Sequence, residues 1–88
     1  MACYIISYDL SVPGRNYDSL YEAIRAYRTW AHINQSVWAV VTTQSAVQVR
    51  DNLSKHLDQN DRIFVVKSGV EAAWRKSICK NEWLKEHL

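Results

Sequence analysis

Apolar side chains occupy both alternating sets of positions in the stretch ACYIISY at residues 2–8. A strand that is apolar on both faces is typical of the centre of a sheet covered on both sides, so this stretch predicts a central strand. The segment 9–16 that follows contains Pro13 and Gly14, a pair that predicts a turn.

The apolar spacing then changes to that of a helix. Tyr17, Leu20, Ile24 and Tyr27 recur at three- and four-residue intervals, which predicts a helix over 17–27 with one apolar face.

A second helix is predicted after Ser45. Ser45 and Gln48 have the spacing of a capping box, in which each side chain bonds the backbone N–H of the other residue. Behind them Val49, Leu53 and Leu57 again recur at helical spacing.

Two further stretches are rich in strand-forming residues, 29–43 and 62–67. Residues 34–36 interrupt the first stretch, which predicts either a hairpin or one long bent strand. Residues 68–88 are mixed and predict an irregular segment followed by a short C-terminal helix.

With the hairpin, this order of elements predicts an α+β, ferredoxin-like βαββαβ fold with an antiparallel sheet, both helices on one face, and a short C-terminal tail helix. Without it, the same pattern gives a three-stranded parallel βαβαβ sheet. We favour the first because the interruption lies near the middle of a region too long for one strand. We expect a single domain over 1–88, with a core at 2–67 and a tail at 68–88.

The sheet face without helices is predicted to be a dimer interface. We expect the tyrosines of the first strand and the strand at 37–41 to approach its two-fold axis.

Composition narrows the class of protein. Hydrophobic residues make up 48% of the chain and charged residues 23%, which is typical of a globular domain. No apolar run approaches the roughly 20 residues of a membrane-spanning helix, and the N-terminus lacks the basic start of a signal peptide. We therefore expect a soluble cytoplasmic protein without a membrane partner. The formal net charge of +2 permits a nucleic-acid partner.

The two cysteines, Cys3 and Cys79, lie at opposite ends of the chain and are expected to be reduced thiols. The sequence has no C-x-x-C, paired histidines, Gly-rich phosphate loop or G-x-S-x-G. It therefore does not support a conventional zinc site, a nucleoside-triphosphate site or a serine hydrolase.

Asp9 is the first candidate for chemistry, because it emerges at the end of the first strand, just before the turn. As a metal ligand Asp9 would need further oxygen ligands beside it, since Mg²⁺ takes one or two carboxylates together with phosphate oxygens and water. A nearby two-fold axis would bring a second Asp9. The alternative is a structural role, in which Asp9 accepts a hydrogen bond from the backbone N–H of Ser11 or Val12.

Arg15 and Arg28 are the candidate nucleic-acid-binding residues. Arg15 lies in the loop after Asp9, where a guanidinium could hold a phosphate through two hydrogen bonds. Arg28 lies next to the first helix. The alternative is that Arg25 and Arg28 form the solvated face of this helix, with Arg25 paired with Glu22, and we favour this interpretation for Arg25.

Three aromatic or imidazole side chains have both a chemical and a structural interpretation. His32 could transfer protons in RNA cleavage, or it could be an exposed histidine of an edge strand. Trp74 and Trp83 could stack on bases, or they could form a lid that completes a thin core.

Three motifs in order carry a resemblance to a known family: YIISYDL at 4–10, QSVW at 35–38 and DQNDRIFVV at 58–66. Together with the loop ending in Arg15, they resemble the CRISPR-associated second Cas protein and small stand-alone Cas-like proteins. The virulence-associated protein D family shares the same plan. The resemblance covers residues 3–67.

The resemblance implies a homodimer of ferredoxin-like subunits. In the Cas members, the aspartate that Asp9 matches is paired across the dimer axis and linked to Mg²⁺-dependent cleavage of RNA or DNA. The implied function is therefore a Mg²⁺-dependent endonuclease with Asp9 as catalytic residue and metal ligand. Some members only hold duplex DNA, so the alternative is a non-catalytic dimer that binds nucleic acid or a protein partner. The sequence departs from the family at Ala39, where an acidic residue is frequent, and in its aromatic tail, where a fifth strand is usual.

Overall fold

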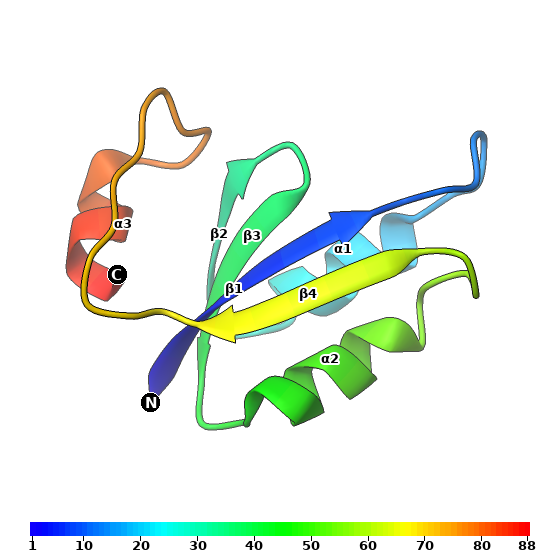
Figure 1. The fold of residues 1–88 in the computed structure, drawn as a ribbon, viewed down its shortest axis with the longest axis horizontal. Coiled ribbons are helices and arrows are strands. Elements are labelled where there is room, and N and C mark those ends of the chain that lie inside the picture. Colours follow the sequence, from blue (N-terminus) through cyan, green and yellow to red (C-terminus); the bar gives the residue numbers. More distant parts are fainter.

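Four strands and three helices follow one another in the computed structural model, which describes residues 1–88. In chain order they are β1 (Ala2–Asp9), α1 (Asp18–Arg25), β2 (Thr29–Asn34), β3 (Val37–Thr42), α2 (Ala46–Ser54), β4 (Arg62–Lys67) and α3 (Asn81–His87). The strands form one antiparallel sheet in the order β2-β3-β1-β4 (Figure 1). The architecture is α+β and compatible with a ferredoxin-like fold.

The hairpin between β2 and β3 is confirmed, and the alternative parallel sheet is wrong. β2 and β3 pair antiparallel from Thr29–Val41 to Asn34–Val37, with an irregularity between His32 and Asn34. The strands reverse at the polar residues that interrupt the apolar stretch in the sequence.

The two long helices begin in different ways. α2 has the predicted capping box: the backbone N–H of Gln48 donates to Ser45 Oγ over 3.2 Å, and the backbone N–H of Ser45 donates to Gln48 Oε1 over 2.8 Å. α1 has no such cap on its N-cap residue, Tyr17, and ends at Arg25, before the predicted boundary at Tyr27.

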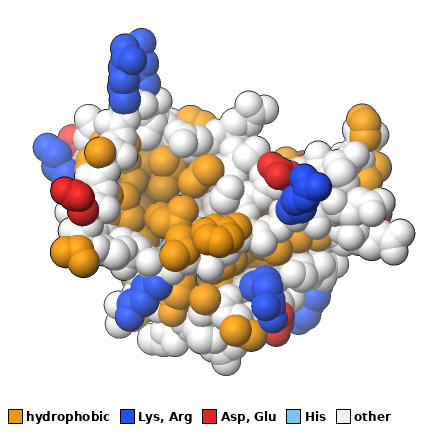
Figure 2. All heavy atoms as spheres, viewed as in Figure 1, with side chains coloured by type: hydrophobic (Ala, Val, Ile, Leu, Met, Phe, Trp, Pro, Cys, Tyr) orange, Lys and Arg blue, Asp and Glu red, His pale blue; other side chains and the backbone are white.

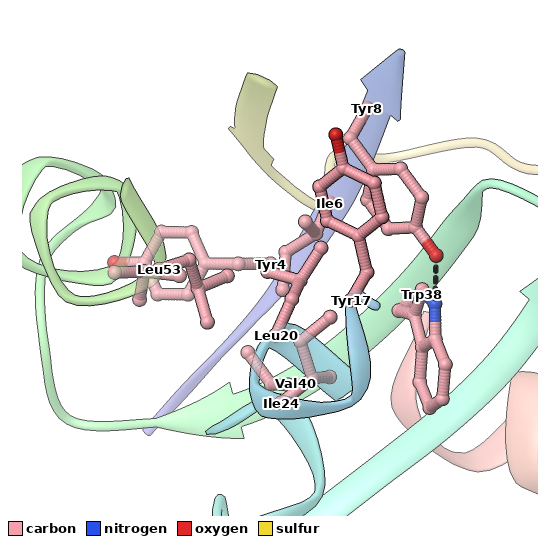
Figure 3. Close-up of a cluster of buried hydrophobic side chains, with 10 residues drawn as sticks. Tyr4, Ile6, Tyr8, Tyr17, Leu20, Ile24, Trp38, Val40 and Leu53 are labelled. Atoms are coloured by element: carbon pink, nitrogen blue, oxygen red, sulfur yellow. Dashed lines mark hydrogen bonds between the residues drawn. The ribbon is translucent and has the colours of Figure 1, made fainter. Parts of the chain in front are cut away.

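The main core lies between one face of the sheet and helices α1 and α2 (Figure 3). Its fully buried aliphatic side chains come from β1, β3 and both helices: Ile6, Leu20, Ile24, Val40, Val49 and Leu53. Tyr4 and Tyr8 of β1 belong to this same cluster. The prediction that these tyrosines approach a dimer axis on the helix-free face is wrong, because strand alternation turns them toward the helices.

The opposite side of the sheet is called the outer face here. Cys3 and Ile5 of β1 lie on it, so β1 is apolar on both faces as predicted. α3 packs there through Leu84, which is fully buried beside Cys3, Ile33 and Ala39. The expected helix-free face is therefore partly covered, because the tail returns across the sheet instead of extending away from it.

Two backbone hydrogen bonds hold the tail against the sheet. The N–H of Ser68 donates to the carbonyl of Cys3 over 2.8 Å, and the N–H of Ile78 donates to the carbonyl of Ile33 over 2.8 Å. The part of the outer face over β4 stays open, with Phe64 and Val66 exposed to 64% and 43%. Figure 2 shows hydrophobic side chains gathered on this side of the molecule. No helix has both the length and the apolar composition needed to cross a membrane.

Candidate functional site

Asp9 is the last residue of β1 and lies directly opposite Arg62, the first residue of β4. By alternation from Cys3 and Ile5, its side chain belongs to the outer face. Asp9 Oδ2 lies 3.7 Å from Arg62 Nη1, and the two side chains are 74% and 84% exposed. An ion pair with this exposure is weak, so the Asp9 carboxylate is open to other partners.

A surface hollow surrounds this pair. Its lining consists of residues from the facing ends of β1 and β4: Ser7, Tyr8, Asp9, Arg62, Ile63 and Phe64. The hollow places one carboxylate, one guanidinium and one exposed aromatic ring at the same corner of the sheet.

The structural role considered for Asp9 belongs to another residue. The backbone N–H of Ser11 donates to Asp61 Oδ1 over 2.7 Å, and the Ser11 hydroxyl donates to the same oxygen over 3.0 Å. The Tyr17 hydroxyl also donates to Asp61 Oδ1, over 3.0 Å, and the backbone N–H of Asp58 donates to Oδ2 over 2.7 Å. Asp61, and not Asp9, therefore orders the loop between β1 and α1.

These hydrogen bonds set the acidity of Asp61. Burial by itself would raise the pKa of its carboxyl group, but the bonds from the Ser11 and Asp58 amides and from the Tyr17 and Ser11 hydroxyls outweigh it. Together they lower the pKa of Asp61 to about 2, because each one favours the charged form. Burial and the bond to Asp61 raise the pKa of Tyr17 in turn.

Arg15 joins the same two loops. Its Nη1 lies 3.4 Å from Asp58 Oδ1, its Nη2 donates to the His56 carbonyl over 3.4 Å, and its guanidinium lies 5.0 Å from the centre of the Tyr17 ring. The structure thus binds Arg15 to the loop between α2 and β4, while Asp9 is paired with Arg62.

Arg28 lies at the other end of the sheet. It lines a pocket with Thr42 of β3, and Thr42 pairs with Ala2 at the start of β1. Asp9 is at the opposite end of β1, about 23 Å away at roughly 3.3 Å per residue. The structure therefore does not bring Arg28 and Asp9 together.

Arg62 and Phe64 were missed as site residues. In the sequence Arg62 is one of several scattered basic residues, and Phe64 is one apolar position in a strand. Only the register of β4 against β1 places them beside Asp9 and Ser7.

One chain supplies only some of the ligands that a magnesium ion needs. A carboxylate is the ligand type that Mg²⁺ prefers, and Asp9 supplies one that is exposed. No cluster of three or more His, Cys, Asp or Glu side chains occurs in the structure. Asp9 could hold Mg²⁺ only together with further oxygen ligands, such as a second Asp9 and a phosphate.

The remaining candidates lie elsewhere. His32 is half-buried and stacks on Trp38, with ring centres 4.0 Å apart. Trp74 and Trp83 pack against the core cluster of the outer face, so the structural prediction of a lid is confirmed. The expected pairing of Arg25 with Glu22 is wrong: the Arg25 guanidinium instead lies 6.0 Å from the centre of the Trp38 ring.

A search against models of known protein families finds none that matches the chain. The fold and the site define the chain as a small α+β protein with an exposed Asp–Arg pair at one corner of an antiparallel sheet. The relationship to the Cas and virulence-associated protein D families stays a prediction from the motifs.

Proposed function

We propose that this protein is a Cas-like homodimer that cleaves RNA or DNA with Mg²⁺, each protomer contributing Asp9 to one shared site. The observation that carries the proposal is that the Asp9 carboxylate is exposed and has no structural role in its loop. It lies at the end of a central strand, and the loop does not need it because Asp61 performs the structural role.

The open part of the outer face supports the dimer. Phe64 and Val66 expose large apolar side chains there, next to Ser7 and Ile5 of β1 in register. Burying such a patch against its copy would remove apolar surface from water, which is the main favourable term in association. Asp9 lies at the same end of the sheet as Phe64, so a two-fold axis through this region would bring two Asp9 carboxylates near each other.

Arg62 gives the proposed site a group for the substrate. A bound Mg²⁺ would polarise a phosphate oxygen and supply an activated water. The exposed Arg62 guanidinium could hold a neighbouring phosphate once the metal has taken its place beside Asp9.

The test is cleavage of single-stranded and duplex RNA and DNA by the purified protein in Mg²⁺, Mn²⁺ or EDTA. We expect Asp9→Asn to abolish metal-dependent cleavage while the protein stays folded, because Asn cannot supply the charged ligand. Asp51→Asn is the matched control, since Asp51 is also an exposed aspartate paired with an arginine, 2.9 Å from Arg50 on α2. Cleavage retained by Asp9→Asn would refute the metal site. A monomer by light scattering at tens of micromolar would refute the shared site.

The Asp9–Arg62 pair also favours a second function, a non-catalytic dimer that binds nucleic acid or a protein partner. Arg62 lies 3.7 Å from Asp9, and its exposed guanidinium could hold a phosphate of a nucleic acid without any metal. Binding of nucleic acid that is unaffected by EDTA, without cleavage, would support this function over the nuclease.

A further inference from the structure

A second pocket lies on the helix side of the sheet, between α1 and the β2–β3 hairpin. Its lining comes from β1, α1, β2, β3 and the hairpin turn: Tyr8, Tyr21, Arg25, His32, Gln35 and Trp38. We call it the aromatic pocket. Its volume of ≈ 310 Å³ falls at the lower end of the range of about 300–1,000 Å³ for small-molecule sites. Asp9 belongs to the opposite face of the sheet, and Tyr8 is the one residue that lines both this pocket and the hollow at Asp9.

Stacked rings form the wall of this pocket. Trp38 is only 3% exposed because His32 stacks on it at 4.0 Å and Tyr21 at 6.2 Å between ring centres. Trp30 is not part of the lining, but it lies two residues before His32 on the same face of β2. Its ring centre is 5.7 Å from that of Trp38, and it is 38% exposed. The rings of Trp30, His32 and Tyr21 therefore present aromatic surface on which a planar ligand could stack.

A cation without a carboxylate partner lies beside these rings. The Arg25 guanidinium is 6.0 Å from the centre of Trp38, its side chain is exposed, and no ion pair engages it. The lining of the pocket contains neither Asp nor Glu. An anionic group would therefore meet one positive charge and no negative charge within the pocket.

Neutral hydrogen-bonding groups complete the pocket. Trp38 Nε1–H donates to the Tyr8 hydroxyl over 2.9 Å (Figure 3). Burial raises the pKa of Tyr8, the bond from Trp38 lowers it and Tyr21 raises it, so that the net direction is upward and the phenol stays protonated. His32 Nε2 lies 3.1 Å from the Gln35 carbonyl, and because a carbonyl only accepts, Nε2 carries the proton and Nδ1 is left for another partner.

We propose that the aromatic pocket binds one nucleotide, with the base stacked on Trp30 and His32 and the phosphate held by Arg25. The aromatic surface fits the base of a nucleotide, and the unpaired guanidinium beside it fits the phosphate. A base or a phosphate alone would use only part of the pocket. The nucleotide could be a free nucleoside monophosphate or the end of a single strand. Neither Asp9, a metal nor a dimer is required, so this inference and the proposed nuclease can fail separately.

The test titrates the full-length protein, in EDTA, with AMP, UMP, adenosine and inorganic phosphate. Isothermal titration calorimetry measures affinity, and the Trp indole N–H signals in NMR report the place of binding. We expect AMP to bind at least tenfold more tightly than either adenosine or phosphate. A 5′-phosphorylated RNA oligonucleotide distinguishes a free nucleotide from a strand end. Saturable binding of AMP indicates a free nucleotide, whereas binding of the oligonucleotide without binding of AMP indicates a strand end.

Two variants locate the site. Arg25→Ala should weaken binding at least tenfold, whereas Arg50→Ala should not change it, since Arg50 is an exposed helical arginine paired with Asp51. Trp30→Ala should weaken binding by about fivefold or more if the base stacks there. Wild-type affinity in Arg25→Ala would overturn the proposal. So would equal binding of AMP and adenosine, equal binding of AMP and phosphate, or no binding of AMP and of the oligonucleotide at millimolar concentration.

Discussion

Shortening Leu84 to alanine tests how firmly α3 is part of the fold. Leu84 is the one buried residue of α3 and is fully buried among Cys3, Ile33 and Ala39 on the outer face. Leu→Ala in a core costs about 2–5 kcal/mol, from lost transfer free energy and from the cavity that remains. Because α3 is a short terminal helix that can shift to fill part of the cavity, we expect a loss of about 2–3 kcal/mol.

That loss is large for a domain of this size. Each kcal/mol lowers the melting temperature of a 60–100-residue domain by about 4–8 °C, so Leu84→Ala should melt about 8–24 °C below the wild type. Thermal and urea unfolding, followed by circular dichroism and by tryptophan fluorescence, would measure it. Trp74 and Trp83 pack in the same cluster and would report its opening.

Val70→Ala is the control for this measurement. Val70 lies in the same tail but is fully exposed, so its truncation should change the free energy of unfolding by no more than about 0.5 kcal/mol. If Leu84→Ala also stays within about 0.5 kcal/mol of the wild type, the packing argument is refuted. In that case α3 would not be docked, and the surface open to a dimer would include the whole outer face.

Two further predictions concern the loops and helices that support the sites. The lowered pKa of Asp61, about 2 against an ordinary 3.8, means that its hydrogen bonds stabilise the fold fully above pH 4 and are lost as the pH falls toward 2. Asp61→Asn should therefore be less stable than the wild type at neutral pH, and in melting experiments the difference should shrink between pH 4 and pH 2; a constant difference would contradict this account. Ser45→Ala should lower the free energy of unfolding by about 1 kcal/mol in urea unfolding, because it removes the acceptor for the Gln48 N–H, whereas an unchanged stability would show that the capping box contributes nothing.

Much of the local structure could be predicted from the sequence. The capping box at Ser45 and Gln48, the hairpin at 34–36 and the apolar periods of β1 and α2 depend on residues within a few positions of one another. Their hydrogen bonds and faces follow from the period of the strand or helix itself. The element order, and with it the α+β class, came from these signals alone.

The candidate site was predicted only in part. Asp9 could be found because a carboxylate at the end of an apolar strand is a local feature. Its partner Arg62 could not, since a residue 53 positions along the chain becomes a neighbour only through the register of β4 on β1. For the same reason the sequence could not show that Asp61, 50 residues from Ser11, orders the first loop.

The sequence by itself thus determined which segments are strands and helices and which carboxylate ends the first strand. The tertiary structure decided which polar groups meet, that α3 covers part of a face expected to be open, and that Arg25 lies over Trp38 instead of pairing with Glu22. The physical reason is the range of the interactions. Backbone period and caps act between near neighbours, whereas strand register and tail docking are set by the packing of the whole chain, in which many weak apolar contacts are satisfied together.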